Sequence, residues 1–266
     1  MTTVFDRAYA AGFFDGDGSV GVSSRENLRW APRSHAQVSQ KSVDPLIWLR
    51  DRWEGSLFWN SSSQIWCWKV VGPKASRFFS DTAPYLIIKE VKAALAVQMQ
   101  NRMNHRGKPA SDDYLKVMGE FKGAIELTYP VPPRPQRQTT DVAYAAGLFD
   151  AEGSITLRQF PDRFPLIYLS VSQKDPEILC WLRERWGGKV KKRPAKGYGK
   201  EPTHEWYLYS KMARGFLRSI QPWLIVKRRL TDICVTWDDL VTPNGRYQPE
   251  QKQQIVELLS TWSPRW

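Results

Sequence analysis

Two carboxylates, Asp17 and Glu152, occupy equivalent positions in two copies of one short motif. Residues 8–20 are AYAAGFFDGDGSV, and residues 143–155 are AYAAGLFDAEGSI. Each copy predicts a helix that ends at a glycine turn, so each acid stands at the carboxyl end of its helix. Carboxylate and backbone carbonyl oxygens are hard ligands that suit Mg²⁺. An acid that merely caps a solvent-facing turn is the alternative, but its recurrence at matched positions favours a functional pair.

The duplication extends beyond this motif. Residues 37–55, QVSQKSVDPLIWLRDRWEG, recur as 170–188, SVSQKDPEILCWLRERWGG. Residues 84–89, PYLIIK, recur as 222–227, PWLIVK. Because the blocks keep their order, the chain is a tandem duplication of one structural unit.

A proline-rich segment separates the two copies. Residues 127–140, LTYPVPPRPQRQTT, carry four prolines in a basic, polar context, which favours a stiff extended connector and forbids a helix. We therefore expect an N-terminal half at 1–126, a linker at 127–140 and a C-terminal half at 141–266.

Each half has the same pattern of predicted elements: helix, two strands, helix, two strands, helices. Short alternating runs such as HAQVSQ and IYLSVSQ are typical of half-exposed strands, and SLFWN, QIWCWKVV, KVKKR and HEWYLYS are further expected strands. Asp44-Pro45 and Asp175-Pro176 predict helix starts, with Asp as the cap and Pro in the first turn. The expected fold class is α+β with one antiparallel sheet per half.

Small residues form a stripe along both motif helices. Glycine inside a helix costs roughly 1 kcal/mol against alanine, and close approach of a second helix explains that cost. We expect the two helices to pack on each other in parallel, which brings Asp17 and Glu152 side by side. Two metal ions about 4 Å apart are a known device for phosphodiester hydrolysis. The stripe residues are Ala8, Gly12, Gly16, Ala143, Gly147 and Ala151.

The motifs AAGFFDGDG (10–18) and AAGLFDAEG (145–153) resemble the signature of the LAGLIDADG homing endonucleases in their single-chain, two-motif form. Alanine replaces the usual first leucine in both copies. The resemblance implies two pseudo-symmetric αββαββα units, each with a DNA-binding antiparallel sheet, joined at the paired motif helices. It also implies site-specific, metal-dependent hydrolysis of both strands of a long asymmetric DNA target, with a staggered cut. Asp15 and Asp150 are then expected to support the structure rather than bind metal.

The resemblance also assigns roles in the site. Asp17 and Glu152, with the backbone of Gly16 and Ala151, are expected to hold two or three Mg²⁺ ions. Mn²⁺ is expected to substitute, and Ca²⁺ to bind without cleavage. Two matched pairs complete the expected catalytic set: Gln40 and Gln173, which orient metal-bound water, and Lys89 and Lys227, which stabilise phosphate charge. Exposed strand-end glutamines and lysines that extend from a buried run to solvent are the alternatives.

The sheets are the expected DNA-binding surface, because antiparallel ribbons fit the major groove and alternate residues share a face. For each candidate a solvated strand face is the alternative. Segments 25–33 and 191–202 are expected to contact phosphates. The candidate DNA contacts are Ser23, Arg25, Asn27, Arg33, Gln37, Trp68, Thr156, Arg158, Ser170, Lys191, Arg193 and Trp206.

Composition agrees with a nucleic-acid partner. Among 266 residues, 39 are basic and 27 acidic, and the net charge of +12 indicates a polyanionic partner. No apolar run approaches the ~18 residues of a membrane span, and the N-terminus lacks the features of a secretory signal. The three cysteines form no zinc pattern. We expect an intracellular monomer that binds double-stranded DNA and no membrane.

Two other functions fit parts of the sequence. An RNA maturase or a regulator on the same fold would bind nucleic acid without cutting it. A basic scaffold or membrane-surface protein would need a basic amphipathic helix, and none is as clear as the strand pattern. The two intact carboxylates, with matched Gln and Lys residues, favour cleavage.

Overall fold

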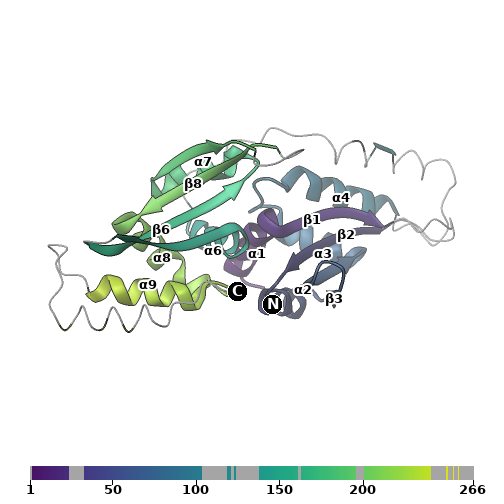
Figure 1. The fold of residues 1–266 in the computed structure, drawn as a ribbon. Helices are drawn as coiled ribbons and strands as arrows, with labels where there is room; N and C mark the ends of the chain where they lie inside the picture. The colour runs from purple at the N-terminus through teal and green to yellow at the C-terminus, as the bar shows by residue number, and fades with distance from the viewer. Residues whose placement is uncertain are drawn as a thin grey trace. The chain divides into compact units, whose positions relative to one another are not determined.

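The computed structural model divides the chain into two compact units, Met1–Ala151 and Glu152–Trp266. Figure 1 shows the course of the chain. Of the expected linker at 127–140, only 138–140 lies among the described residues. The structure describes residues 2–23, 33–103, 119–120, 123, 138–160, 163–195, 201–240, 250, 254 and 257.

In the first unit a four-stranded antiparallel sheet has the order β1-β2-β4-β3. The final helix of this unit, α6, ends at Glu152, the first residue of the second unit. The elements in chain order are α1 (Val4–Asp17), β1 (Gly18–Ser23), β2 (Arg33–Gln40), α2 (Asp44–Trp53), β3 (Ser56–Asn60), β4 (Ile65–Val71), α3 (Pro73–Thr82), α4 (Glu90–Met103) and α6 (Asp141–Glu152).

The second unit has a sheet of the same kind, with the order β5-β6-β8-β7. Because both sheets are antiparallel and have equivalent strand orders, the expected α+β class with one sheet per half is confirmed. The elements in chain order are β5 (Gly153–Phe160), β6 (Arg163–Gln173), α7 (Pro176–Trp186), β7 (Lys189–Arg193), β8 (Thr203–Tyr209), α8 (Ser210–Ile220), the 3₁₀ helix η1 (Gln221–Trp223) and α9 (Arg228–Leu240).

The helix starts predicted at the two Asp-Pro pairs are both found, but only one of the two aspartates caps its helix. In α7, Asp175 is the N-cap, and its Oδ1 accepts a hydrogen bond from Glu177 N at 2.9 Å. In α2 the N-cap is Val43, whose side chain cannot cap, and Asp44 lies in the first turn. The expected capping role of Asp44 is therefore wrong, although Pro45 lies in the first turn as predicted. The acid still suits the positive end of the helix dipole.

Aromatic side chains between sheet and helices form the core of each unit. In the first unit the Phe78 ring lies 5.2 Å from Phe14 and 5.2 Å from Trp68, centre to centre. In the second unit the Phe216 ring lies 5.1 Å from Trp206. These edge-on ring pairs pack one face of each sheet against helices.

Among the helices that the structure describes, none combines the length and apolar composition that a membrane span requires.

Candidate active site

Helices α1 and α6 touch backbone to backbone at Gly12 and Gly147. A Cβ atom at Gly12 would lie 2.0 Å from Tyr144 O, and one at Gly147 would lie 2.0 Å from Tyr9 O. No side chain larger than hydrogen fits at either position. The close contact predicted from the small-residue stripe is therefore confirmed.

Two tyrosines reinforce this contact. Tyr9 OH donates to Asp150 Oδ2 at 2.8 Å, and Tyr144 OH donates to Asp15 Oδ2 at 2.6 Å. Burial of Tyr9 and the neighbouring Asp150 charge raise the pKa of that phenol well above its ordinary value, so it remains a donor. The sequence interpretation overlooked both tyrosines, although the Ala-Tyr pair recurs in both motif copies.

Asp15 anchors the turn that leads into α4. Its carboxylate accepts hydrogen bonds from Ile87 N at 2.6 Å and Lys89 N at 2.9 Å. The Nζ of Lys89 donates to the backbone oxygen of Asp15 at 2.5 Å. Asp15 is buried and fully engaged in structure, as expected, and it places Lys89 at the carboxyl end of α1.

Asp17 and Glu152 each accept a hydrogen bond from the glutamine that ends the second strand. Gln40 Nε2 donates to Asp17 Oδ2 at 2.7 Å, within the first unit. Gln173 Nε2 donates to Glu152 Oε1 at 3.0 Å, within the second. The duplicated sequence therefore builds the same acid–amide pair twice.

Of the other expected site residues, Gly16 and Ala151 directly precede the two acids, whereas Lys227 lies far from them in the sequence. Gly16 and Ala151 are in the last turn of their helices, where carbonyl oxygens lack an intrahelical partner. Lys227 directly precedes α9 and is 6% exposed. Within the described part of the chain, no three His, Cys, Asp or Glu side chains gather to hold a metal ion. Any metal site built from Asp17 or Glu152 would thus need further oxygen ligands.

On the first sheet the strand register brings three predicted DNA contacts to one face. Ser23 pairs with Arg33, and Gln37 pairs with Ser19, which lies four residues before Ser23. Paired residues, and residues an even number apart on one strand, share a face. Arg33 is exposed at the end of β2. Two further candidates, Arg25 and Asn27, and most of segment 25–33, lie outside the described residues.

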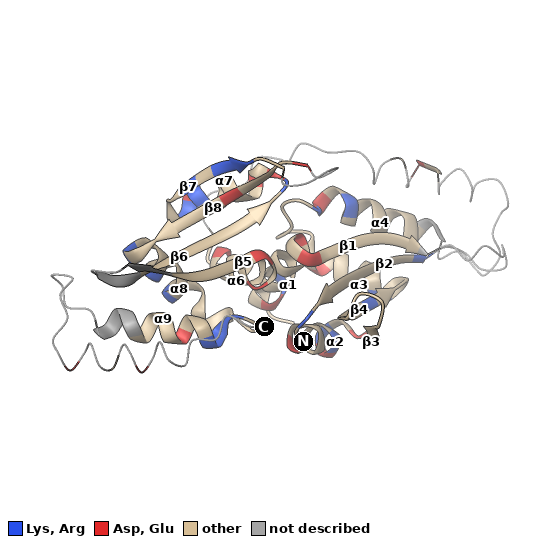
Figure 2. Ribbon diagram, viewed as in Figure 1, with Lys and Arg blue, Asp and Glu red and all other residues tan. Residues whose placement is uncertain are grey.

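On the second sheet the register brings the remaining polar candidates to one face. The paired residues are Ser154 with Ser170, Thr156 with Tyr168, Arg158 with Leu166 and Lys191 with Glu205. Arg193 follows two residues after Lys191 on β7, which carries Lys or Arg along much of its length (Figure 2). Thr156 is exposed, but Ser170 is only 7% exposed and offers a base little surface. Residues 196–200 of segment 191–202 are outside the described part.

Trp68 and Trp206 do not lie on these faces, and their prediction as DNA contacts is wrong. Both side chains are 0% exposed. Trp68 Nε1 donates to Glu54 O at 2.7 Å, and Trp206 Nε1 donates to Gly187 O at 2.8 Å. With its ring in the core and its only polar atom satisfied, each tryptophan anchors a strand to the turn after the preceding helix.

Comparisons with known proteins identify the fold. No family model and no curated protein matches the sequence. Among solved structures, the fold is that of the LAGLIDADG homing endonucleases, as the motif resemblance implied.

Three of these solved structures cover nearly the whole chain. I-GzeII in complex with its DNA target has 16% identity and a TM-score of 0.70, covering 97% of this chain and 98% of its own. I-SmaMI bound to uncleaved DNA in the presence of calcium ions has 16% identity and a TM-score of 0.62, with coverages of 96% and 97%. I-SmaMI bound to cleaved DNA has 15% identity and a TM-score of 0.64, with coverages of 97% and 96%.

Proposed function

We propose that this protein is a site-specific endonuclease that hydrolyses both strands of a long, asymmetric double-stranded DNA target and leaves a staggered cut. The observation that carries the proposal is the matched pair of acid–amide contacts, Asp17 with Gln40 and Glu152 with Gln173. A fold whose solved examples include complexes with uncleaved and cleaved DNA supports it. A DNA target implies that the protein works in a compartment that contains DNA.

The carboxylates would serve as metal ligands. Each one follows its helix's contact glycine by five residues, about 7.5 Å of helix, so the two acids occupy equivalent places on α1 and α6. With the carbonyls of Gly16 and Ala151 they offer the hard oxygen ligands that fit Mg²⁺, and DNA phosphates would supply more. Bound divalent ions would activate water and stabilise the leaving oxygen. We propose that Mg²⁺ or Mn²⁺ supports cleavage and that Ca²⁺ supports binding alone.

The surrounding side chains have roles that do not depend on metal geometry. Gln40 and Gln173 hold one carboxylate oxygen each and so fix the direction of the acid. Lys89 is held at the end of α1 by Asp15, where its ammonium would stabilise charge on a bound phosphate. We assign Lys227 the equivalent role in the second half, because it ends the repeated segment.

Binding would use the open faces of the two sheets. Arg33 and Gln37 in the first unit, and Thr156, Lys191 and Arg193 in the second, are polar and accessible on those faces. The net charge of +12 would attract the DNA backbone and make affinity strongly dependent on salt. Base contacts from the strands would then select the sequence.

Selection from a randomised double-stranded DNA library tests the proposal. The protein is incubated with the library in Mg²⁺, and in Ca²⁺ as a control, and both bound and cut molecules are sequenced. We expect one long consensus that is bound in both ions and cut only in Mg²⁺. A consensus that is bound but never cut would contradict the proposed endonuclease activity and favour a binding protein on this fold. Intron RNA would then be the next ligand to test.

A further inference from the structure

A buried acid lies on the second sheet's open face, where the proposed function puts DNA. Glu205 is 1% exposed and pairs directly across the sheet with Lys191. A carboxylate on a surface that binds a polyanion weakens attraction, so its presence needs a reason.

Glu205 ties together two basic side chains of β7. Its Oε2 lies 2.9 Å from Lys191 Nζ, and its Oε1 accepts a hydrogen bond from Arg193 Nη2. Lys191 Nζ also lies 4.7 Å above the Tyr207 ring. The side chains of Lys191 and Arg193 are 44% and 47% exposed, so each remains accessible to a ligand.

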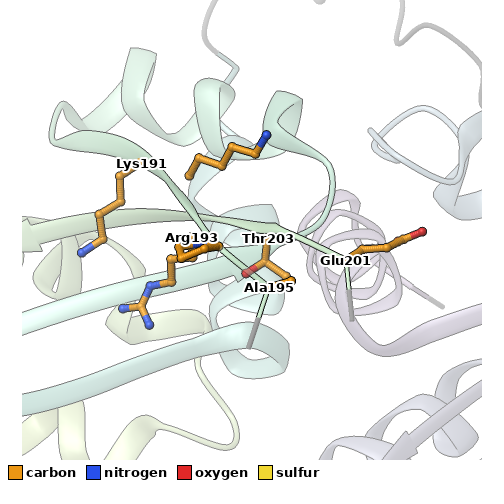
Figure 3. Close-up of a pocket in the computed structure, with 7 residues that line it drawn as sticks. Lys191, Arg193, Ala195, Glu201 and Thr203 are labelled. Carbon is orange, nitrogen blue, oxygen red and sulfur yellow. The ribbon is translucent and has the colours of Figure 1, made fainter. Parts of the chain in front are cut away.

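Lys191 and Arg193 extend to the same side of β7, whereas Glu201 points away from them (Figure 3). They border a hollow of about 510 Å³ near the end of the β7–β8 hairpin. The arrangement leaves open space beside two oriented cations.

The acid remains charged in this setting. Burial raises the pKa of Glu205, but hydrogen bonds and charges from Arg193 and Lys191 outweigh it and hold that pKa below its ordinary value. The cluster is therefore two cations around one anion at neutral pH. The Glu205 carboxylate lowers the positive charge of this surface by one, and its contacts hold the side chains of Lys191 and Arg193 in place.

The fold itself does not require this cluster. Trp68 and Trp206 are equivalent core residues of the two sheets, so the position equivalent to Glu205 is Cys67 in the first sheet. Cys67 pairs with Phe58, where the second sheet pairs Glu205 with Lys191. The same sheet topology forms with apolar residues at this place, which argues against a purely structural role for the acid.

We propose that Glu205 is a positioning residue for sequence recognition, holding Lys191 and Arg193 so that they contact base edges rather than phosphates. The inference rests on the proposed function of the open sheet face. Arginine has five N–H donors, and the contact with Glu205 engages only one of its nitrogens. Because Arg and Lys pair best with the O6 and N7 atoms of guanine, the base pairs under β7 should include a required guanine.

The test compares sequence selection by the intact protein with that by Glu205→Gln, in Ca²⁺ so that binding alone is measured. We expect Glu205→Gln to lose at least about fivefold discrimination at one or two adjacent positions, while the rest of the consensus persists. Affinity for unrelated DNA should rise, and the slope of log affinity against log salt should steepen by about one, because a negative charge is removed. Loss of stability alone would produce neither change.

Glu201→Gln is the matched control, because it removes the same charge from the same hairpin. Glu201 pairs at 2.9 Å with Lys174, and among the described residues its ion pair is with that lysine rather than with the β7 cations. The Glu201→Gln variant should select the same consensus sequence as the intact protein. Lys191→Gln and Arg193→Gln, at exposed side chains, give a second route if Glu205→Gln does not fold, and they should lose discrimination at the same positions.

The results of these experiments distinguish failure of the proposed function from failure of the role assigned to Glu205. If the intact protein selects no sequence, the proposed function fails and this inference fails with it. If the intact protein selects a consensus that Glu205→Gln, or both β7 variants, retain in full, the role of Glu205 is wrong and the proposed function stands.

Discussion

His35 is an ionisable residue that the first sheet keeps neutral on its open face. It pairs with Gly21, and a Cβ there would lie 2.6 Å from His35 Nε2, so the imidazole covers the glycine. Burial, and then the charge of Lys69, lower the pKa of His35 to about 4. Within the described residues its Nδ1 is buried without a hydrogen-bond partner.

This histidine should make stability depend on pH. In the unfolded chain His35 takes up a proton near pH 6.5, whereas in the folded protein it resists until about pH 4. The unfolded state therefore binds the proton first, so the free energy of unfolding should fall as pH drops from 6.5 to 4. Below pH 4 both states are protonated, and this group causes no further loss. Urea unfolding at a series of pH values should show a shallower fall in His35→Gln. Identical slopes in both proteins would contradict the assigned pKa.

Single residues show where sequence interpretation succeeds and where it fails. The acids and glutamines of the motif were predictable because the duplication marks them twice. Trp68 was wrongly predicted as a DNA contact because the strand IWCWKVV has apolar residues at both odd and even positions. Alternation alone therefore does not show which face of this strand is buried. Glu205 was missed because an acid in HEWYLYS suggests exposure, and only the register reveals Lys191 opposite it.

At the scale of elements, the α1–α6 contact leaves no room for a side chain at either contact glycine. Backbone atoms of Tyr9 and Tyr144 occupy the space that a Cβ on the opposing glycine would need. Backbone cannot rotate away as a flexible side chain can, so the helices would have to separate to admit even one methyl group.

Gly12→Ala and Gly147→Ala should therefore each lower the free energy of unfolding by at least about 3 kcal/mol, near the upper end of overpacking effects. The measurement is urea unfolding followed by circular dichroism. Gly215→Ala, within α8, is the matched control, since a Cβ there would meet no other element of the described part of the chain within 4 Å. It should raise stability by up to about 1 kcal/mol through helix propensity. A cost below about 1 kcal/mol for Gly12→Ala would contradict the close contact.

Elements were predictable to the extent that local signals fix them. Repeated blocks set the order of helices and strands in both units, and Asp175-Pro176 began a helix as expected. Asp44 did not cap α2, because an acid before proline suits either the cap or the first turn and the sequence does not distinguish them. The order of the strands in each sheet could not be predicted from the sequence, because it depends on packing between residues far apart in the chain.

At the scale of the whole molecule, two units with the same sheet topology carry different side chains on their open faces. The first has His35, Gln37 and Lys69, and the second has a charged cluster around Glu205. Such unequal faces agree with the proposed asymmetric DNA target, in which each unit would recognise its own stretch of DNA. The DNA target sequence could not be predicted from the amino-acid sequence, because it depends on combinations of side chains and on deformation of the DNA.

In the proposed function, one carboxylate from each motif copy, Asp17 or Glu152, is required for cleavage. The most direct test is cleavage of the selected DNA in Mg²⁺ by the intact protein and by the double variant Asp17→Asn, Glu152→Gln, with DNA affinity measured in parallel. We expect the double variant to lose cleavage by at least about a thousandfold while binding the same sequence with affinity within about tenfold, because metal-site charge acts on the transition state. Cleavage at the intact protein's rate by the double variant would show that neither acid is needed and would rule out this active site.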